Sequence, residues 1–413
     1  MALAEVLVPT FLDFGFFTVS FLLSQNNSDW YSKMMIRNIL CELSDDKYQG
    51  RQAGEIGGEK AGEYILNYLK TIFKNNDNVD IYTQDFEFSF SSNPHMKNVN
   101  YGNKLAKNII CYIDNNQNET LVIGAHYDHV GLGDFGSRDK DGKGLIHNGA
   151  DDNASGVALA ITLIDLLYDS NKSYNYLFIA FDGEEMGLYG SSFFCKNPTI
   201  DLADIRFMLN FDMVGRLNEN KDLAINGTGT SSKWQTLINE LNVDENFSLK
   251  LSESGIGPSD HSSFYLHEIP AIHFFTGQHN DYHTPRDKRN TINYEGIFEI
   301  LKFVYDIIED SSSISVFDFQ ETKNDTRQTP KFSVTLGVMP DYLYSGKGMR
   351  IDGVSKEKTA GQFGIKKGDI VIKMGSVDVE DMMSYMQGLS KFKKGDSTIV
   401  KILRDGKEID ISI

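Results

Sequence analysis

Five short motifs carry the histidines and carboxylates of this sequence that could bind metal ions together. They are GAHYDHVG with His126 and Asp128, HNGADDNASG with Asp151 and Asp152, FDGEEMGLYGS with Glu184 and Glu185, NFDMVGR with Asp212, and DYHTPRD with His283. Zinc accepts imidazole nitrogen and carboxylate oxygen, and a catalytic zinc site leaves one position open for water. A pair of zinc ions needs two terminal ligands each, one bridging carboxylate and a base for the water between them. The motifs offer these types, so the sequence predicts a hydrolase.

Taken singly, the first two motifs have ordinary structural explanations. A carboxylate two residues after His126 can fold back to orient its imidazole, as metal-bound histidines require, but an HxD pair is also common in plain loops. An aspartate at a helix start is often only an N-cap. Two adjacent ones flanked by Gly149 and Gly156 instead suggest a backbone that closely approaches an ion.

The other motifs place carboxylates in apolar surroundings. Glu184 and Glu185 end a nearly apolar strand, and because neighbouring side chains point in different directions, one can ligate while the other acts as a base. Asp212 interrupts the apolar FMLNFDMVG, where an unpaired carboxylate would be costly.

Two further residues are candidates for the site. Tyr282 could present its phenol to a developing oxyanion, although packing is its commoner role. Asp260, in PSDHSSF, is a candidate for a residue that contacts the metal ligands without binding a metal itself.

The segments around these motifs alternate between short β-rich runs and helical stretches. The expected strands are 108–113, 121–125, 176–181, 207–211 and 271–275, and the expected helices include 57–73, 154–167 and 294–308. This alternation predicts an α/β fold with a predominantly parallel or mixed central sheet flanked by helices. Because His126, Glu184 and Asp212 each follow a strand, they should meet at the carboxyl ends of the strands.

Charge and composition limit the partners and the compartment. The net charge of −18 argues against nucleic acid or an anionic membrane as a partner. The three cysteines cannot form a disulfide framework. Residues 1–28 contain an apolar run of signal-peptide length, too short for a stable membrane span, but no basic residue precedes Lys33. We interpret them as a leader of an exported, periplasmic or secreted protein; a buried strand or helix is the alternative.

Together the motifs resemble the di-zinc aminopeptidases of the leucyl-aminopeptidase-like superfamily, which also contains glutamate carboxypeptidase and the transferrin receptor. The resemblance spans roughly residues 35–310 and includes the GRQAG segment at 50–54. It implies a zinc-exopeptidase fold and two Zn²⁺ ions. It also implies a cis peptide bond after Asp152. The implied roles, residue by residue, are His126 and Asp212 on one zinc, Glu185 and His283 on the other, Asp152 bridging them, Glu184 as general base, Asp128 as the partner of His126, and Tyr282 as oxyanion donor.

The resemblance implies an aminopeptidase that acts on peptides and leaves three alternatives open. A carboxypeptidase would need basic residues near the site, for which Arg138, Arg216 and Arg286 are the candidates. Glutaminyl cyclases of the superfamily use one zinc, so a full two-metal set disfavours them. A non-catalytic peptide-binding protein, like the transferrin receptor, would have lost ligands, and none is missing here.

The C-terminal region resembles a PDZ domain. In residues 331–413 a short loop with Leu336 and Gly337 precedes a strand, a small-residue turn and a strand that contains Gly-Asp. PDZ domains capture peptides or C-termini at a sheet edge, which would make Leu336 and Gly337 the docking residues. We therefore expect a peptidase domain at 29–310, a polar linker at 311–330 and a small β-rich PDZ domain at 331–413; a small domain that only packs on the peptidase is the alternative.

Overall fold

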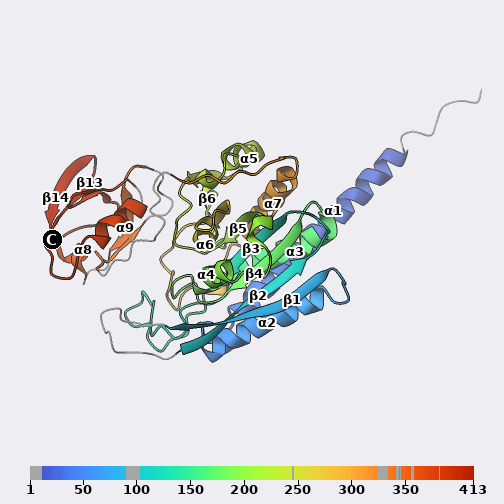
Figure 1. The fold of residues 1–413 in the computed structure, drawn as a ribbon, viewed down its shortest axis with the longest axis horizontal. Helices are drawn as coiled ribbons and strands as arrows, with labels where there is room; N and C mark the ends of the chain where they lie inside the picture. Colours follow the sequence, from blue (N-terminus) through green and yellow to red (C-terminus); the bar gives the residue numbers. More distant parts are fainter. Residues whose placement is uncertain are drawn as a thin grey trace, which may run out of the picture.

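Two β-sheets organise the chain. The structure is a computed structural model that describes residues 12–89, 103–243, 246–322, 334–340, 344, 346–354, 358–380 and 382–413. An eight-stranded sheet forms the centre of a large domain (residues 12–322), and a six-stranded sheet forms a small domain (residues 334–413). Figure 1 shows the small domain beside the large one.

The sheet of the large domain is mixed, as the sequence predicts. Its order is β1-β2-β4-β3-β5-β8-β6-β7, with β4, β3, β5 and β8 parallel and with β1, β2 and β6 antiparallel to their inner neighbours. The strands are β1 (Val79–Ser89), β2 (Asn103–Ile113), β3 (Thr120–His126), β4 (Asn175–Phe181), β5 (Ile205–Phe211), β6 (Asp222–Asn226), β7 (Ser248–Ser252) and β8 (Ala271–Phe275). The four parallel strands are completely buried, which fits their unbroken apolar sequences.

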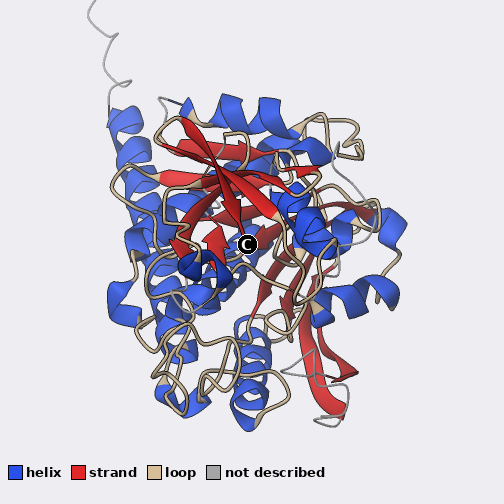
Figure 2. Cartoon of the chain, turned by 90° about the vertical axis from the view of Figure 1, so that its left-hand side faces the viewer, coloured by secondary structure: helices blue, strands red, loops and turns tan. Residues whose placement is uncertain are grey.

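Helices cover both faces of this sheet, because each central strand is apolar on both sides. In β3, Leu121 and Ile123 join the core on one face, while Val122 joins the core on the other. The first face is covered by α1 (Leu12–Leu43), α2 (Ile56–Ile72), α3 (Gly156–Ser170), α5 (Trp234–Leu241) and α7 (Tyr294–Ser311). The second is covered by α4 (Tyr189–Lys196) and α6 (His261–Tyr265). Figure 2 views the molecule from the side of the small domain and shows helices around the outside of its strands.

The first helix covers most of the predicted leader. Residues 1–11 of that leader lie outside the described residues, and residues 12–28 belong to α1. Ile36, Ile39, Leu40 and Leu43 are fully buried at helical spacing, so the C-terminal half of α1 is part of the core. The N-terminal part of α1 extends away from the sheet (Figure 1). Among the described helices, none combines the length and apolarity needed to cross a membrane.

The small domain has a core of its own. Its strands are β9 (Val338–Pro340), β10 (Met349–Val354), β11 (Ile370–Met374), β12 (Val377–Asp378), β13 (Ile399–Arg404) and β14 (Lys407–Ser412), and its helices are α8 (Thr359–Gln362) and α9 (Met382–Ser390). All the strand pairs are antiparallel. Val371, Val400 and Ile402 are fully buried between this sheet and the two helices.

The segment predicted as a linker lies against the large domain. After α7 ends at Ser311, Phe317 packs on Trp234 with ring centroids 4.5 Å apart, and Asp318 accepts hydrogen bonds from two serines. The backbone N–H of Thr322 donates to the Tyr265 hydroxyl at 3.0 Å. Residues 323–330 lie outside the described residues. In the small domain, Met386 of α9 packs against Tyr265, so the two domains are in contact there.

Candidate metal centre

The residues singled out in the sequence lie at one edge of the large sheet. His126 is the last residue of β3, Glu184 and Glu185 follow β4, and Asp212 directly follows β5. His283 lies in the loop after β8. Because these four strands are parallel, their carboxyl ends, and the loops that follow them, meet at the same edge.

Two groups of donor atoms form there. His126, Glu184 and Asp212 make one group, and Asp152, Glu185 and His283, joined by His129, make the other; within each group the donor atoms lie within 4.8 Å of one another. The Nε2 atom of His126 is 3.3 Å from Asp212 Oδ1, and the Nε2 atom of His283 is 3.0 Å from Glu185 Oε2.

Asp152 connects the two groups. Its Oδ1 is 3.4 Å from His126 Nε2, and its Oδ2 is 3.0 Å from His283 Nε2. The side chain comes from the irregular turn Ala150–Ser155, which leads into α3, and the Asp152–Asn153 peptide bond is cis, as the resemblance implies. With one oxygen facing each group, this carboxylate has the arrangement that a bridging ligand needs.

Asp128 holds the two glutamates through their backbone. Its Oδ1 accepts a hydrogen bond from the N–H of Glu184 at 3.1 Å, and its Oδ2 accepts one from the N–H of Glu185 at 3.3 Å. The same Oδ1 is 3.6 Å from the Nδ1 atom of His126. Asp128 is fully buried, so it ties the loop after β3 to the loop after β4.

Asp151 points away from Asp152 and supports the same turn. Its Oδ1 accepts a hydrogen bond from the N–H of Gly215 at 2.6 Å, and its Oδ2 is 3.1 Å from His279 Nε2. The backbone N–H groups of both aspartates donate to the carboxylate of Asp287, at 2.9 Å and 3.1 Å. Asp287 is the last residue of the DYHTPRD motif. Its residue type and spacing did not predict that it would accept these backbone hydrogen bonds.

Arg51 joins three segments behind the metal site. Its side chain is fully buried and donates to the carbonyl oxygens of Leu43, Tyr127, Asn148 and Gly149 at 2.6–2.9 Å. These carbonyls belong to the end of α1, the loop after β3 and the approach to Asp152. Arg51 lies in the GRQAG segment, which the sequence marks only as part of the resemblance.

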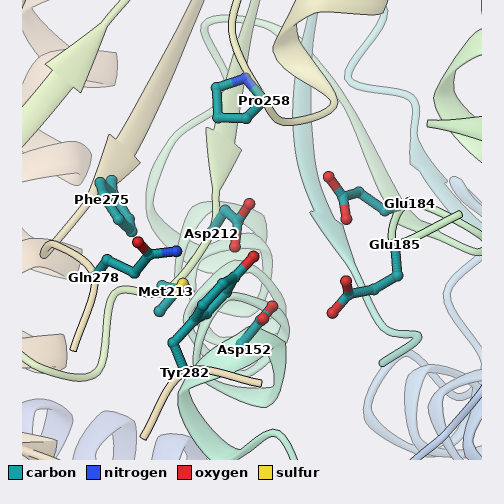
Figure 3. A pocket seen from close by; sticks show the side chains of 9 residues that line it. All are labelled: Asp152, Glu184, Glu185, Asp212, Met213, Pro258, Phe275, Gln278 and Tyr282. Atoms are coloured by element: carbon teal, nitrogen blue, oxygen red, sulfur yellow. The ribbon is translucent and has the colours of Figure 1, made fainter. Parts of the chain in front are cut away.

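A pocket opens above the two donor groups. Figure 3 shows Glu184 and Glu185 on one side of it and Phe275, Gln278 and Met213 on the other, with Asp152, Asp212 and Tyr282 between them. Pro258 forms a further part of the wall. The ring of Tyr282 stacks on the imidazole of His283, with centroids 3.9 Å apart.

The sequence analysis selected Asp260 as a candidate site residue but did not select His129. Asp260 is fully buried in the turn before α6, and burial raises the pKa of its carboxyl to about 7. His129, which the sequence analysis did not select as a ligand, has its Nδ1 2.8 Å from Glu185 Oε1 and 3.6 Å from Asp152 Oδ2. Its position directly after Asp128, in the sequence HYDH, was the only feature of the sequence that could have pointed to it.

In the small domain, the two predicted docking residues lie just before β9. Leu336 is buried and its carbonyl accepts a hydrogen bond from the N–H of Ala360 in α8. Gly337 has a φ of +75°, and a Cβ atom there would lie 2.1 Å from the Cβ of Lys358, so this position favours glycine. Among the described residues, β9 pairs only with β10 and is therefore an edge strand.

Parts of the large domain are similar in sequence to known peptidases. Residues 108–308 match the model of peptidase family M28. Leucine aminopeptidase 2 of Trichophyton rubrum is 27% identical over 169 residues, which are 39% of this chain and 31% of that protein. Aminopeptidase YwaD of Bacillus subtilis (strain 168) is 28% identical over 192 residues, 43% of this chain and 38% of that protein. Part of the chain is thus similar to M28 peptidases and to aminopeptidases, and the matches span well under two thirds of these relatives.

Solved structures with the same fold include both aminopeptidases and cyclases. BSAP, a zinc aminopeptidase from Bacillus subtilis, superposes with a TM-score of 0.56 and 18% identity, covering 70% of this chain and 98% of that one. A glutaminyl cyclase from Porphyromonas gingivalis gives a TM-score of 0.56 and 15% identity, covering 68% and 98%. At these identities the likeness establishes the zinc-exopeptidase fold of the large domain.

The electrostatics of the two donor groups call for cations. Burial and the neighbouring Glu185 raise the pKa of Asp152 to about 7, and burial with several nearby carboxylates raises the pKa of Glu184 well above its usual value. Burial opposes protonation of His283, but Glu185 and Asp152 still raise the pKa of its imidazole to about 10. Its Nε2 is buried without a well-oriented hydrogen bond, although two carboxylate oxygens lie 3.0 Å away. Nitrogen and carboxylate donors facing one space are a set that zinc accepts, so the residues fit this metal.

Proposed function

We propose that this protein is a zinc-dependent aminopeptidase with a pair of ions between its two donor groups. His126 and Asp212 would hold one ion, Glu185 and His283 the other, and Asp152 both. The observation that carries the proposal is the position of Asp152, whose two oxygens face His126 and His283 at 3.4 Å and 3.0 Å. When bound, the zinc ions would polarise the scissile carbonyl and lower the pKa of water.

Glu184 is the general base in this proposal. Its side chain belongs to the first donor group and lines the pocket, with Oε2 3.9 Å from His126 Nε2, while its backbone is fixed by Asp128. It accepts the proton of the attacking water and passes it to the departing amine. Tyr282, on the pocket wall, donates a hydrogen bond to the oxygen that develops negative charge.

The pocket suggests which substrates enter. Met213 and Phe275 pack together and line the wall away from the two glutamates, with Tyr282 against them. This apolar surface would favour substrates with an apolar N-terminal side chain. The carboxylates nearby would favour a free α-amine over a blocked one, because an acylated amine carries no positive charge.

Two other activities on the same fold are less well supported. A carboxypeptidase needs a cation for the substrate carboxylate, but Arg138, Arg216 and Arg286 are all absent from the described pocket lining. Arg216 and Arg286 are instead paired with Asp281. A glutaminyl cyclase is favoured only by the fold, whereas donor groups for two ions favour a hydrolase.

A panel of aminoacyl-arylamides, each with and without an N-acetyl group, tests the proposal. We expect zinc-dependent cleavage of the free-amine substrates, fastest for apolar side chains, and none of the acetylated ones. Glutaminyl-arylamide distinguishes the cyclase, which would release ammonia from it and leave the arylamide bond intact. Absence of any zinc-dependent turnover on the panel would contradict the aminopeptidase.

The small domain is proposed to dock extended peptides or protein C-termini. Support comes from the edge position of β9, directly after Leu336 and Gly337, because an extended peptide can add to an edge strand through its backbone. A docked peptide would be held at high local concentration near the metal site. Kinetics on long and short peptides, with and without residues 323–413, test this: only long peptides should lose efficiency when the small domain is removed.

A further inference from the structure

We propose that His129 is a positioning residue that holds one oxygen of the Glu185 carboxylate, so that the other oxygen faces the ion-binding space beside His283. This inference rests on the proposed function, because it takes Glu185 as a metal ligand. It assigns a role to a histidine that occupies no place in the ligand set proposed above.

The contacts divide the two oxygens of Glu185 between two imidazoles. Oε1 lies 2.8 Å from His129 Nδ1, which is a hydrogen-bond distance, and Oε2 lies 3.0 Å from His283 Nε2. The backbone N–H of Glu185 is held by Asp128 at the same time. Main chain and carboxylate are therefore both fixed, and Glu185 has little side-chain freedom left to lose when a metal binds.

The His129 ring is itself rigidly placed. The side chain is fully buried, and its backbone N–H donates to the carbonyl of Arg51 at 3.2 Å. A Cβ atom at Gly149 would lie 2.6 Å from ring atoms of His129, so the ring packs directly on a glycine backbone. The ring also meets the imidazole of His283 edge-on, with centroids 5.3 Å apart.

A hydrogen-bond donor explains these contacts better than a further ligand. The Nδ1 atom is 2.8 Å from Glu185 Oε1 but 3.6 Å from Asp152 Oδ2. It is therefore directed at the Glu185 carboxylate and not at the centre of the donor group. The Nε2 atom is buried without a hydrogen-bond partner among the described residues. A buried N–H left unpaired costs more than an unpaired lone pair, which places the proton on Nδ1, where it can be donated to Glu185.

The experiment compares metal binding in three variants. His129→Leu removes the donor, whereas His129→Asn keeps an N–H close to the position of Nδ1. His267→Leu is the matched control, because His267 is exposed just after α6 and its Nδ1 lies 2.8 Å from the carbonyl of Ser263, away from the donor groups. Zinc affinity is measured by competition with a chelator, and the surroundings of the ions by the visible absorption of the Co²⁺-loaded protein.

We expect His129→Leu to bind one of its two ions about 10–100-fold more weakly, as is usual when the partner of a metal ligand is lost. His129→Asn should recover most of that affinity with an unchanged Co²⁺ spectrum, and His267→Leu should equal the wild type. Wild-type binding by His129→Leu would overturn the proposal. So would a His129→Asn variant that binds weakly with an altered spectrum, which would make His129 a ligand.

Two further results keep the inference separate from the proposed function. If His129→Leu does not fold, His129→Ala, which removes the same donor, is measured in its place, and wild-type binding by that variant likewise overturns the proposal. If the wild type itself binds no zinc or Co²⁺, the proposed function fails and the positioning role fails with it, whereas normal binding by the wild type with unaffected variants removes only the role of His129.

Discussion

The strongest prediction concerns Arg51, which touches no substrate. Replacing it by methionine keeps much of the volume but removes the guanidinium donors from four buried carbonyls, of which that of Gly149 keeps the N–H of Ala154 at 3.3 Å. A hydrogen bond to a charged group contributes about 1.5–3 kcal/mol, so even the lower end of the range for four bonds is about 6 kcal/mol. Domains are stable by only about 5–15 kcal/mol, so we expect Arg51→Met to be largely unfolded.

Arg51→Lys makes the effect measurable. Lysine keeps the positive charge that Asp152, Asp287, Asp128 and Glu185 stabilise in the native protein, but it offers three donors in place of a planar fork. We expect a loss of about 3 kcal/mol in the free energy of unfolding. Denaturant unfolding followed by tryptophan fluorescence measures it, since Trp234 is fully buried in the large domain.

Arg289→Met is the matched control, because Arg289 is exposed and its guanidinium makes one long hydrogen bond, 3.4 Å, to the carbonyl of Cys41 and a long ion pair, 3.8 Å, with Asp45. A surface substitution of this kind changes stability by about 0.5 kcal/mol or less. Arg51 variants that both unfold within about 1 kcal/mol of the wild type would refute the reasoning, because four charge-assisted bonds cannot then be contributing as the geometry implies.

Three further predictions address the chemistry and the domain boundary. Glu184→Gln should retain its zinc but lose about a hundred- to ten-thousand-fold in turnover, measured with an aminoacyl-arylamide and metal analysis; normal turnover would exclude Glu184 as the base. Asp152→Asn should lower the zinc content of the purified protein below one ion per chain, since both donor groups lose a carboxylate oxygen; a full complement of zinc would argue against a bridge. A chain ending after Thr322 should melt like the large domain of the full protein, whereas one ending at Ser311 loses Phe317 and should be about 3 kcal/mol less stable; equal melting temperatures would contradict the packing seen here.

The strands could be predicted from the sequence because their signal is local. Each central strand is a short apolar run, and donor residues stand at or soon after the ends of β3, β4 and β5, so neighbouring residues in the sequence are enough to recognise the pattern. The order of the strands is not local. The insertion of β4 between β2 and β3, and the antiparallel return of β6 beside β8, depend on which faces pack together, and no spacing in the sequence encodes that.

The polar segment after α7 shows a second limit of sequence interpretation. Residues 311–322 lack any periodicity, so composition favours a linker. Two isolated aromatics fix the segment nonetheless: Phe317 lies against Trp234, and Phe319 against Tyr265. One or two such contacts, each placed by the tertiary structure, leave no repeating pattern that could be recognised in advance.

The residues that sequence analysis missed at the metal site have a common physical role. Arg51 binds carbonyls of the loops that carry His126 and Asp152, and Asp287 binds the N–H groups of Asp151 and Asp152. Asp128, identified as the partner of His126, does the same for the two glutamates.

Each of these three buried charged side chains therefore binds the backbone of a segment that carries donor residues. Every residue type has the same backbone carbonyl, and every type but proline has the same N–H. A side chain that recognises main chain leaves no partner residue to search for in the sequence. Residues that can ligate zinc, by contrast, are of a few types, so they are visible as motifs. This asymmetry explains why the donor set could be predicted from five motifs while most of its support became apparent only in the structure.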